Sequence, residues 1–68
     1  MGMGRDPLAG LLPGDLVRHW ETREIGTVIR FVYANPLVGW RYYDVHFRDG
    51  IQIVPSIDLE LISRVVQN

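Results

Sequence analysis

The sequence contains neither cysteine nor lysine. Without cysteine the chain forms no disulfide and no thiolate metal site, and its other candidate ligands lack a metal-site spacing. All seven basic residues are arginine and the net charge is −1, so long-range attraction to nucleic acid is weak. Arginine forks onto carboxylates and stacks on aromatic rings, which suits interfaces. We therefore expect no metal centre, and nucleic acid is an unfavoured partner.

Long apolar runs are also absent from the sequence. No run approaches the roughly 20 apolar residues that span a bilayer, and none follows a basic start as in a signal peptide. We therefore expect a cytoplasmic protein with no membrane partner. The 68 residues form one small domain, which buries only about 60% of the surface that its unfolded chain exposes. Domains of this size are often stabilised by oligomerisation.

The segment 43–55 predicts a β-hairpin around which the fold is organised. Apolar and polar residues alternate from Tyr43 to Phe47, which indicates a strand with one buried face. Asp49-Gly50 then predicts a tight turn, because glycine accepts a positive φ. A second β-rich run follows, and Pro55 ends it because proline donates no ladder hydrogen bond.

The remaining segments extend this all-β pattern. We predict strands at 16–20, 25–33, 40–47, 51–54 and 60–65, with a short 3₁₀ turn over 55–59. Val17 is an inward-facing candidate. The apolar positions of the second strand do not alternate cleanly, which predicts a β-bulge helped by Gly26. Asp15 is expected to accept backbone N–H groups in its turn, and Ser56 or Asp58 to do so in the 3₁₀ turn.

Five short strands predict a small, closed, all-β barrel, since closure of a sheet removes its edges. By analogy, their order, with a 3₁₀ turn before the last strand, resembles that of a five-stranded, SH3-like small barrel. We place this barrel at residues 13–64. Residues 1–12 are expected to form a flexible tail from which Leu11 and Leu12 pack on the barrel rim, and residues 65–68 form a C-terminal tail.

Two groups of bacterial proteins share this pattern. The runs at 14–18, 26–28, 45–50 and 58–62 resemble Tudor-like and KOW-like barrels. More narrowly, the runs at 14–18, 51–55 and 59–62 resemble the plasmid- and integron-borne, trimethoprim-insensitive type II dihydrofolate reductases. That resemblance implies an SH3-like subunit, a homotetramer around one pore, NADPH as cofactor, and Gln52 and Ile53 lining the pore.

Two residues depart from the reductase pattern. His19 replaces a lysine that supplies positive charge, and histidine, with an ordinary pKa of about 6.5, is mostly neutral at pH 7. Val54 replaces a pore tyrosine and has no hydroxyl. These departures favour a relative that keeps the scaffold but needs neither NADPH nor another cofactor. The candidate ligand-binding residues are Gln52, Ile53, Val54 and His19.

Surplus aromatic residues point to an interface. Trp20, Trp40 and Tyr42, together with Ile51, are the interface candidates, because tryptophan and tyrosine are enriched at binding hot spots. Asp44 and His46 share a strand face and would form either a general-base pair or a solvated surface. No nucleophile accompanies them, so we assign no catalytic residue.

These features support three function classes. We favour a non-enzymatic, SH3-like interaction module, of the kind encoded on integrons or plasmids, that self-associates and binds a protein or small-molecule partner. The first alternative is a homotetrameric, NADPH-dependent type II dihydrofolate reductase. The second is a nucleic-acid-associated Tudor-like or KOW-like module.

Overall fold

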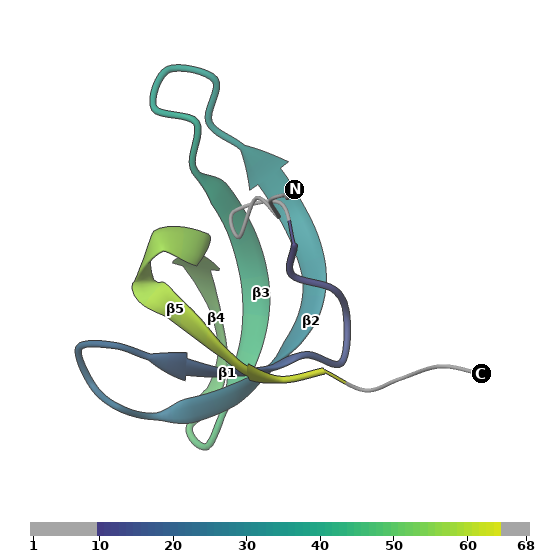
Figure 1. The fold of residues 1–68 in the computed structure, drawn as a ribbon, viewed down its shortest axis with the longest axis vertical. Helices are drawn as coiled ribbons and strands as arrows, with labels where there is room; N and C mark the ends of the chain where they lie inside the picture. The colour runs from purple at the N-terminus through teal and green to yellow at the C-terminus, as the bar shows by residue number, and fades with distance from the viewer. Residues whose placement is uncertain (1–9, 65–68) are drawn as a thin grey trace, which may run out of the picture.

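A computed structural model describes residues 10–64, which form five antiparallel strands in one sheet (Figure 1). The elements are β1 (Leu16–His19), β2 (Ile25–Ala34), β3 (Arg41–Phe47), β4 (Gly50–Pro55), the 3₁₀ turn η2 (Ser56–Asp58) and β5 (Leu59–Ser63). The strand order across the sheet is β4-β3-β2-β1-β5. The predicted all-β class, the five strands and the 3₁₀ turn before the last strand are confirmed.

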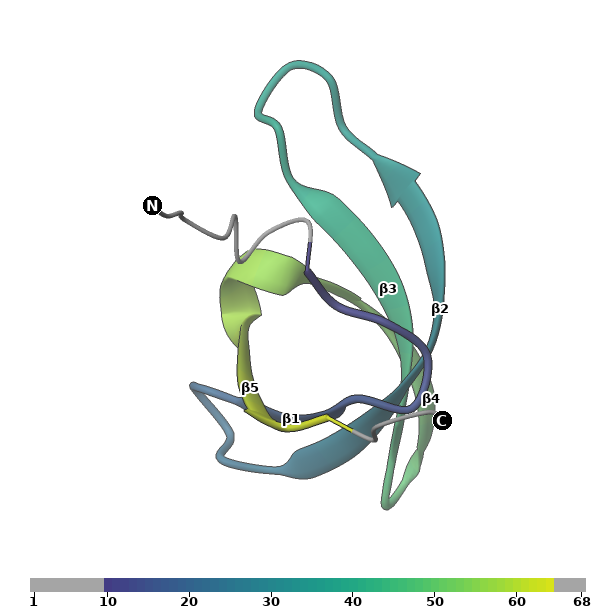
Figure 2. The same cartoon turned by 45° about the vertical axis from the view of Figure 1, so that its right-hand side comes forward.

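The sheet curls strongly, so that β1 and β5 face back toward the middle of β3 (Figures 1 and 2). β1 pairs with β2 on one side and β5 on the other, while β4 pairs with β3. Within residues 10–64 no ladder joins β4 to β5; η2 connects them instead. The curled sheet is therefore open along one seam, the closure expected of a barrel is not formed among these residues, and β4 and β5 remain sheet edges.

Three predicted strands extend past the observed ones. β1 ends at His19, where Arg23 N donates to His19 O at 2.7 Å and closes a turn, so Trp20 lies outside the strand. β3 begins at Arg41 because Trp40 belongs to the β2–β3 turn, where its carbonyl accepts Asn35 N–H at 2.8 Å. β5 ends at Ser63, and position 65 of the predicted strand lies outside the described residues.

The predicted bulge in β2 is present, but Gly26 does not cause it. The register with β3 shifts between Val28 and Arg30 and again between Phe31 and Tyr33, whereas Gly26 pairs regularly with Val17. A Cβ on residue 26 would lie 2.7 Å from Val45 Cγ1. Gly26 is therefore required by the close approach of β3 and not by the bulge.

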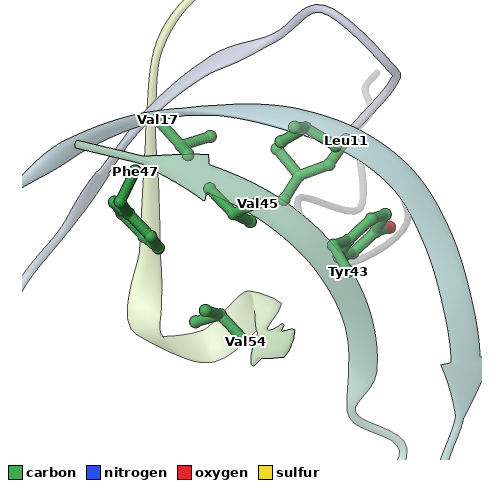
Figure 3. Packing of buried hydrophobic residues seen from close by; sticks show 7 residues of the cluster. Leu11, Val17, Tyr43, Val45, Phe47 and Val54 are labelled. Carbon is green, nitrogen blue, oxygen red and sulfur yellow. The ribbon is translucent and has the colours of Figure 1, made fainter. Parts of the chain in front are cut away.

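The core fills the concave side of the curled sheet (Figure 3). It consists of Leu11, Val17, Val28, Tyr43, Val45, Phe47 and Val54. The alternation predicted for the hairpin is confirmed, because its three inward residues on β3 are all at most 3% exposed. Gly50 has a φ of 134°, the positive value expected in the hairpin turn. Leu11 lies inside the core and not at its rim, so ordered packing begins before residue 13.

A buried ion pair ties the start of the described chain to its end. Asp15 is 1% exposed and accepts the Leu12 N–H at 2.7 Å, as the turn predicted. Arg64 adds two hydrogen bonds to the same carboxylate, at 3.0 and 2.8 Å, and also donates to Gly10 O. Burial of the Asp15 carboxyl raises its pKa, but the hydrogen bonds from Arg64 and Leu12 and the charge of Arg64 outweigh burial, so the pKa is lowered overall.

Candidate functional site: the outer face of β4

The edge strand β4 presents two apolar side chains on the outer face of the sheet. In its register with β3, Ile51 lies opposite His46 and Ile53 opposite Asp44. Residues directly opposite on antiparallel strands point to the same face, so these four side chains share one surface. Ile51 is 62% exposed and Ile53 59%. Two β-branched apolar residues are therefore left in water on this face.

The edge of β4 lacks the charged residues that would prevent another strand from pairing with it. Edge strands usually carry charged residues, bulges or interior prolines that prevent pairing with another chain. β4 (Gly50–Pro55) has no charged residue, its register with β3 is regular, and its only proline is its last residue. β4 therefore has both an available edge and an apolar face.

Gln52 lies on the opposite side of β4 from the two isoleucines. It pairs with Val45, a core residue, so its side chain extends from the inner face. Gln52 is nevertheless exposed, because β4 is the last strand on its side of the sheet. An exposed amide at an open seam can donate to and accept from a ligand.

Val54 does not lie where a ligand-binding residue is expected. It is 4% exposed and packs in the core on the same face as Tyr43, its partner on β3. The sequence predicted Val54 as a ligand-binding residue. The structure corrects this prediction, because the buried side chain offers no surface to a ligand.

His19 is occupied within its own turn. Its Nδ1 accepts the backbone N–H groups of Glu21 at 3.2 Å and Thr22 at 3.4 Å, and its ring meets Phe47 edge-on at 6.4 Å. His19 therefore orders the β1–β2 turn, a role that its sequence position did not reveal.

The four interface candidates do not form one patch. Ile51 and Tyr42 share the outer face of β3 and β4, since Tyr42 lies opposite Pro55. Trp20 is 59% exposed and its Nε1 donates to Asp58 Oδ1 at 3.1 Å, which ties the end of β1 to η2. Trp40 is half-buried in the β2–β3 turn.

The side chains around η2 do not cap it as predicted. Asp58 accepts from Trp20, and Ser56 Oγ is buried with no hydrogen-bond partner among the described residues. η2 has no side-chain cap hydrogen bond. The expectation that Ser56 or Asp58 would satisfy its N–H groups was wrong.

Asp44 is bound by an arginine and not by a histidine. Arg30 Nε donates to Asp44 Oδ2 at 2.8 Å, across the β2–β3 ladder. The Arg30 side chain is 67% exposed, so the pair contributes little to stability. Asp44 and His46 share a face as predicted, and the ion pair with Arg30 supports the interpretation of that face as a solvated surface.

Comparison of the chain with known protein families, curated proteins and solved structures found no match. Among residues 10–64, no three histidine or acidic residues gather as a metal site requires. No helix in the same range is long and apolar enough to cross a membrane. The function therefore has to be argued from the surfaces of the domain themselves.

Proposed function

We propose that the chain is a non-enzymatic SH3-like interaction module that self-associates through β4 and binds a protein or small-molecule partner. The observation that carries the proposal is an uncharged edge strand with Ile51 and Ile53 about 60% exposed. A second copy of the chain is the simplest occupant of such an edge, because an uncharged strand meets itself without repulsion. Association would also offset the small core of a domain this size.

The partner-binding part of the proposal is based on Gln52. Its side chain is exposed beside the open seam between β4 and β5. Copies of one amide brought together by symmetry would give a short chain several hydrogen-bonding groups in one place. We therefore assign Gln52 and the exposed backbone edge of Ile53 to contact with a ligand.

The association is tested by charging the edge. Ile51→Lys with Ile53→Lys should convert an oligomer into a monomer in sedimentation velocity. Each isoleucine buried in a contact contributes roughly 1.5–3 kcal/mol, so we expect at least about 100-fold weaker association. The wild-type melting temperature should rise with protein concentration, and that of the double variant should not.

The matched control for this experiment is Ile25→Lys. Ile25 is also an exposed apolar residue, 53% accessible, but it lies at the start of β2, which β3 separates from β4. It should leave the association unchanged. A wild-type protein that sediments as a monomer at tens of micromolar, or a control that dissociates as completely as the double variant, would contradict self-association through β4.

One observation still favours the alternative of a type II dihydrofolate reductase, namely that Gln52 and Ile53 are exposed on β4. We expect no such activity, because Val54 is a core residue and His19 Nδ1 is engaged by the β1–β2 turn. Neither side chain then offers charge or a hydroxyl to anionic NADPH and dihydrofolate. The assay is NADPH oxidation with dihydrofolate in the presence of trimethoprim. A rate that depends on dihydrofolate and is lost in Gln52→Ala would replace our proposal by the reductase.

A further inference from the structure

The end of the β2–β3 hairpin projects beyond the rest of the sheet (Figures 1 and 2). We call its residues 31–43 the arm. None of the eight acidic residues of the chain lies in the arm, and Arg41 is its only charged residue. Five of the chain's seven aromatic residues lie there, namely Phe31, Tyr33, Trp40, Tyr42 and Tyr43. The arm therefore separates aromatic side chains and one cation from the acidic remainder of the chain.

The tip of the arm is aliphatic. Leu37 is 92% exposed and Val38 54%. Leu37 N donates to Asn35 Oδ1 at 2.9 Å, and Gly39 N donates to Asn35 O at 2.7 Å, so a hydrogen-bonded turn presents both side chains. Leu37 is the most exposed large apolar side chain of residues 10–64. An apolar group presented in this way marks contact with an apolar phase or partner.

Behind the tip lies a level of aromatic rings. Tyr33 and Tyr42 stack with their centroids 4.6 Å apart and their planes within 4°. Trp40 lies between this pair and the tip along the chain. Tyr33 is 47% exposed. Tyrosine and tryptophan rings of this kind favour the interface between lipid and water.

The cation of the arm is directed back from the tip. Arg41 pairs with Ala34 close to the turn, yet its guanidinium lies 5.7 Å from the centre of the Phe31 ring. At the base of the arm, Arg30 forms an ion pair with Asp44, so these two residues add no net charge there. From the tip inward, the arm thus presents aliphatic side chains, aromatic rings and then an arginine.

We propose that the arm attaches the protein to the surface of an anionic lipid bilayer. Leu37 and Val38 enter the boundary of the acyl chains, the rings of Trp40, Tyr33 and Tyr42 lie among the headgroups, and Arg41 faces lipid phosphate. At about 3.3 Å per strand residue, Tyr33 lies roughly 10 Å behind the tip, which matches an insertion depth of about 5–10 Å. We expected no membrane partner because no run spans a bilayer, but surface attachment needs no such run.

Other occupants fit the arm less well. A second copy would need a self-complementary surface, and two projecting tips offer each other little area. Single-stranded nucleic acid would stack on the tyrosines, but it would leave Leu37 and Val38 in water and find only one arginine in the arm. A bilayer accounts for the tip, the rings and the cation together.

The test is cosedimentation of the full chain with vesicles of phosphatidylcholine alone and of phosphatidylcholine mixed with phosphatidylglycerol. Leu37→Ser with Val38→Ser should weaken binding to both vesicles at least about tenfold. Arg41→Gln should weaken binding only to the anionic vesicles, by about fivefold. Ile25→Ser, which removes an exposed isoleucine at the other end of β2, should bind as the wild type does. In a Trp20→Phe variant Trp40 is the only tryptophan, and brominated lipid should quench its fluorescence.

Three results would overturn the proposal. The first is a wild-type protein that does not sediment with anionic vesicles, and the second is a Leu37/Val38 variant that binds them as the wild type does. The third is a change that the same variant shows without lipid. A lower solution mass would assign the arm to a protein contact, and loss of binding to a single-stranded oligonucleotide would assign it to a nucleic-acid contact. Self-association through β4 is measured without lipid, so the two proposals fail independently.

Discussion

Replacing Phe47 by alanine should cost about 3–5 kcal/mol of unfolding free energy, as full truncations of buried aromatic residues do. Phe47 is 3% exposed at the end of β3 and contacts the ring of His19, which orders the β1–β2 turn. The ring therefore connects the central hairpin to the first strand. A loss of this size approaches the whole stability of a small domain. Urea unfolding at fixed protein concentration measures it, with the slope of the transition reporting whether the folded state stays compact.

Phe31→Ala is the matched control for that measurement. Phe31 makes a similar edge-on ring contact, with Tyr43 at 5.7 Å, but it is 45% exposed. Its truncation should cost about 1–2 kcal/mol, since only about half of the side chain leaves water on folding. Equal losses for the two variants, or a Phe47→Ala protein that unfolds within a few tenths of a molar of the wild type, would show that the core is not organised around β3.

The central hairpin could be predicted from the sequence because its information is local. Alternation with period two fixes which face of β3 is buried, and Asp49-Gly50 fixes the turn, independently of the rest of the chain. Gly50 at a φ of 134° and the buried row from Tyr43 to Phe47 follow from those two signals. Local patterns of this strength determine an all-β fold from the sequence alone.

Features that depend on distant segments could not be predicted. Gly26 is needed because Val45 Cγ1 would lie 2.7 Å from a Cβ, which no pattern near residue 26 reveals. Asp15 was expected to accept backbone N–H groups, but its partner Arg64 is 49 residues away. The end of β1 before Trp20 likewise involves a distant partner, because Trp20 N donates to Asp58 O at 3.1 Å.

The candidate site was predicted in part. The resemblance named Gln52 and Ile53, and both are exposed on an edge strand. It also named Val54, but alternation along β4 puts that residue in the core beside Tyr43. The arm was missed, although the sequence held a signal for it: residues 31–43 contain five aromatic residues, one arginine and no acid. Only the projecting hairpin shows that most of these residues leave the body of the sheet, whereas Tyr43 packs in the core.

Removing the Asp15 carboxylate should cause the second large loss of unfolding free energy. Asp15→Ala leaves the Leu12 N–H and Arg64 Nε without their acceptor, and Arg64 Nη2 keeps only its bond to Gly10 O. Hydrogen bonds to a buried charged group contribute about 1.5–3 kcal/mol, and loss of the turn contact adds to this, so we expect a cost of about 3 kcal/mol at pH 7. Asp15→Asn should recover part of it, because an amide oxygen still accepts from Leu12. Asp44→Ala, which removes the carboxylate paired with the exposed Arg30, is the matched control and should cost no more than about 1 kcal/mol.

The pH dependence separates the charge of Asp15 from its packing. Its pKa in the folded protein lies below the ordinary value of 3.8, because the bonds from Arg64 and Leu12 outweigh the opposing effect of burial. A carboxyl whose folded pKa is lowered stabilises fully above its unfolded pKa, and this contribution is lost as the pH falls through the folded pKa. The stability difference between wild type and Asp15→Ala should therefore be constant from about pH 5 to 8 and shrink steadily below about pH 4. Urea unfolding across this range measures the difference. A stability difference that persists unchanged at pH 2 would mean that Asp15 acts through packing alone. A difference no larger than that caused by Asp44→Ala would mean that the Asp15–Arg64 ion pair does not hold the two ends of the fold together.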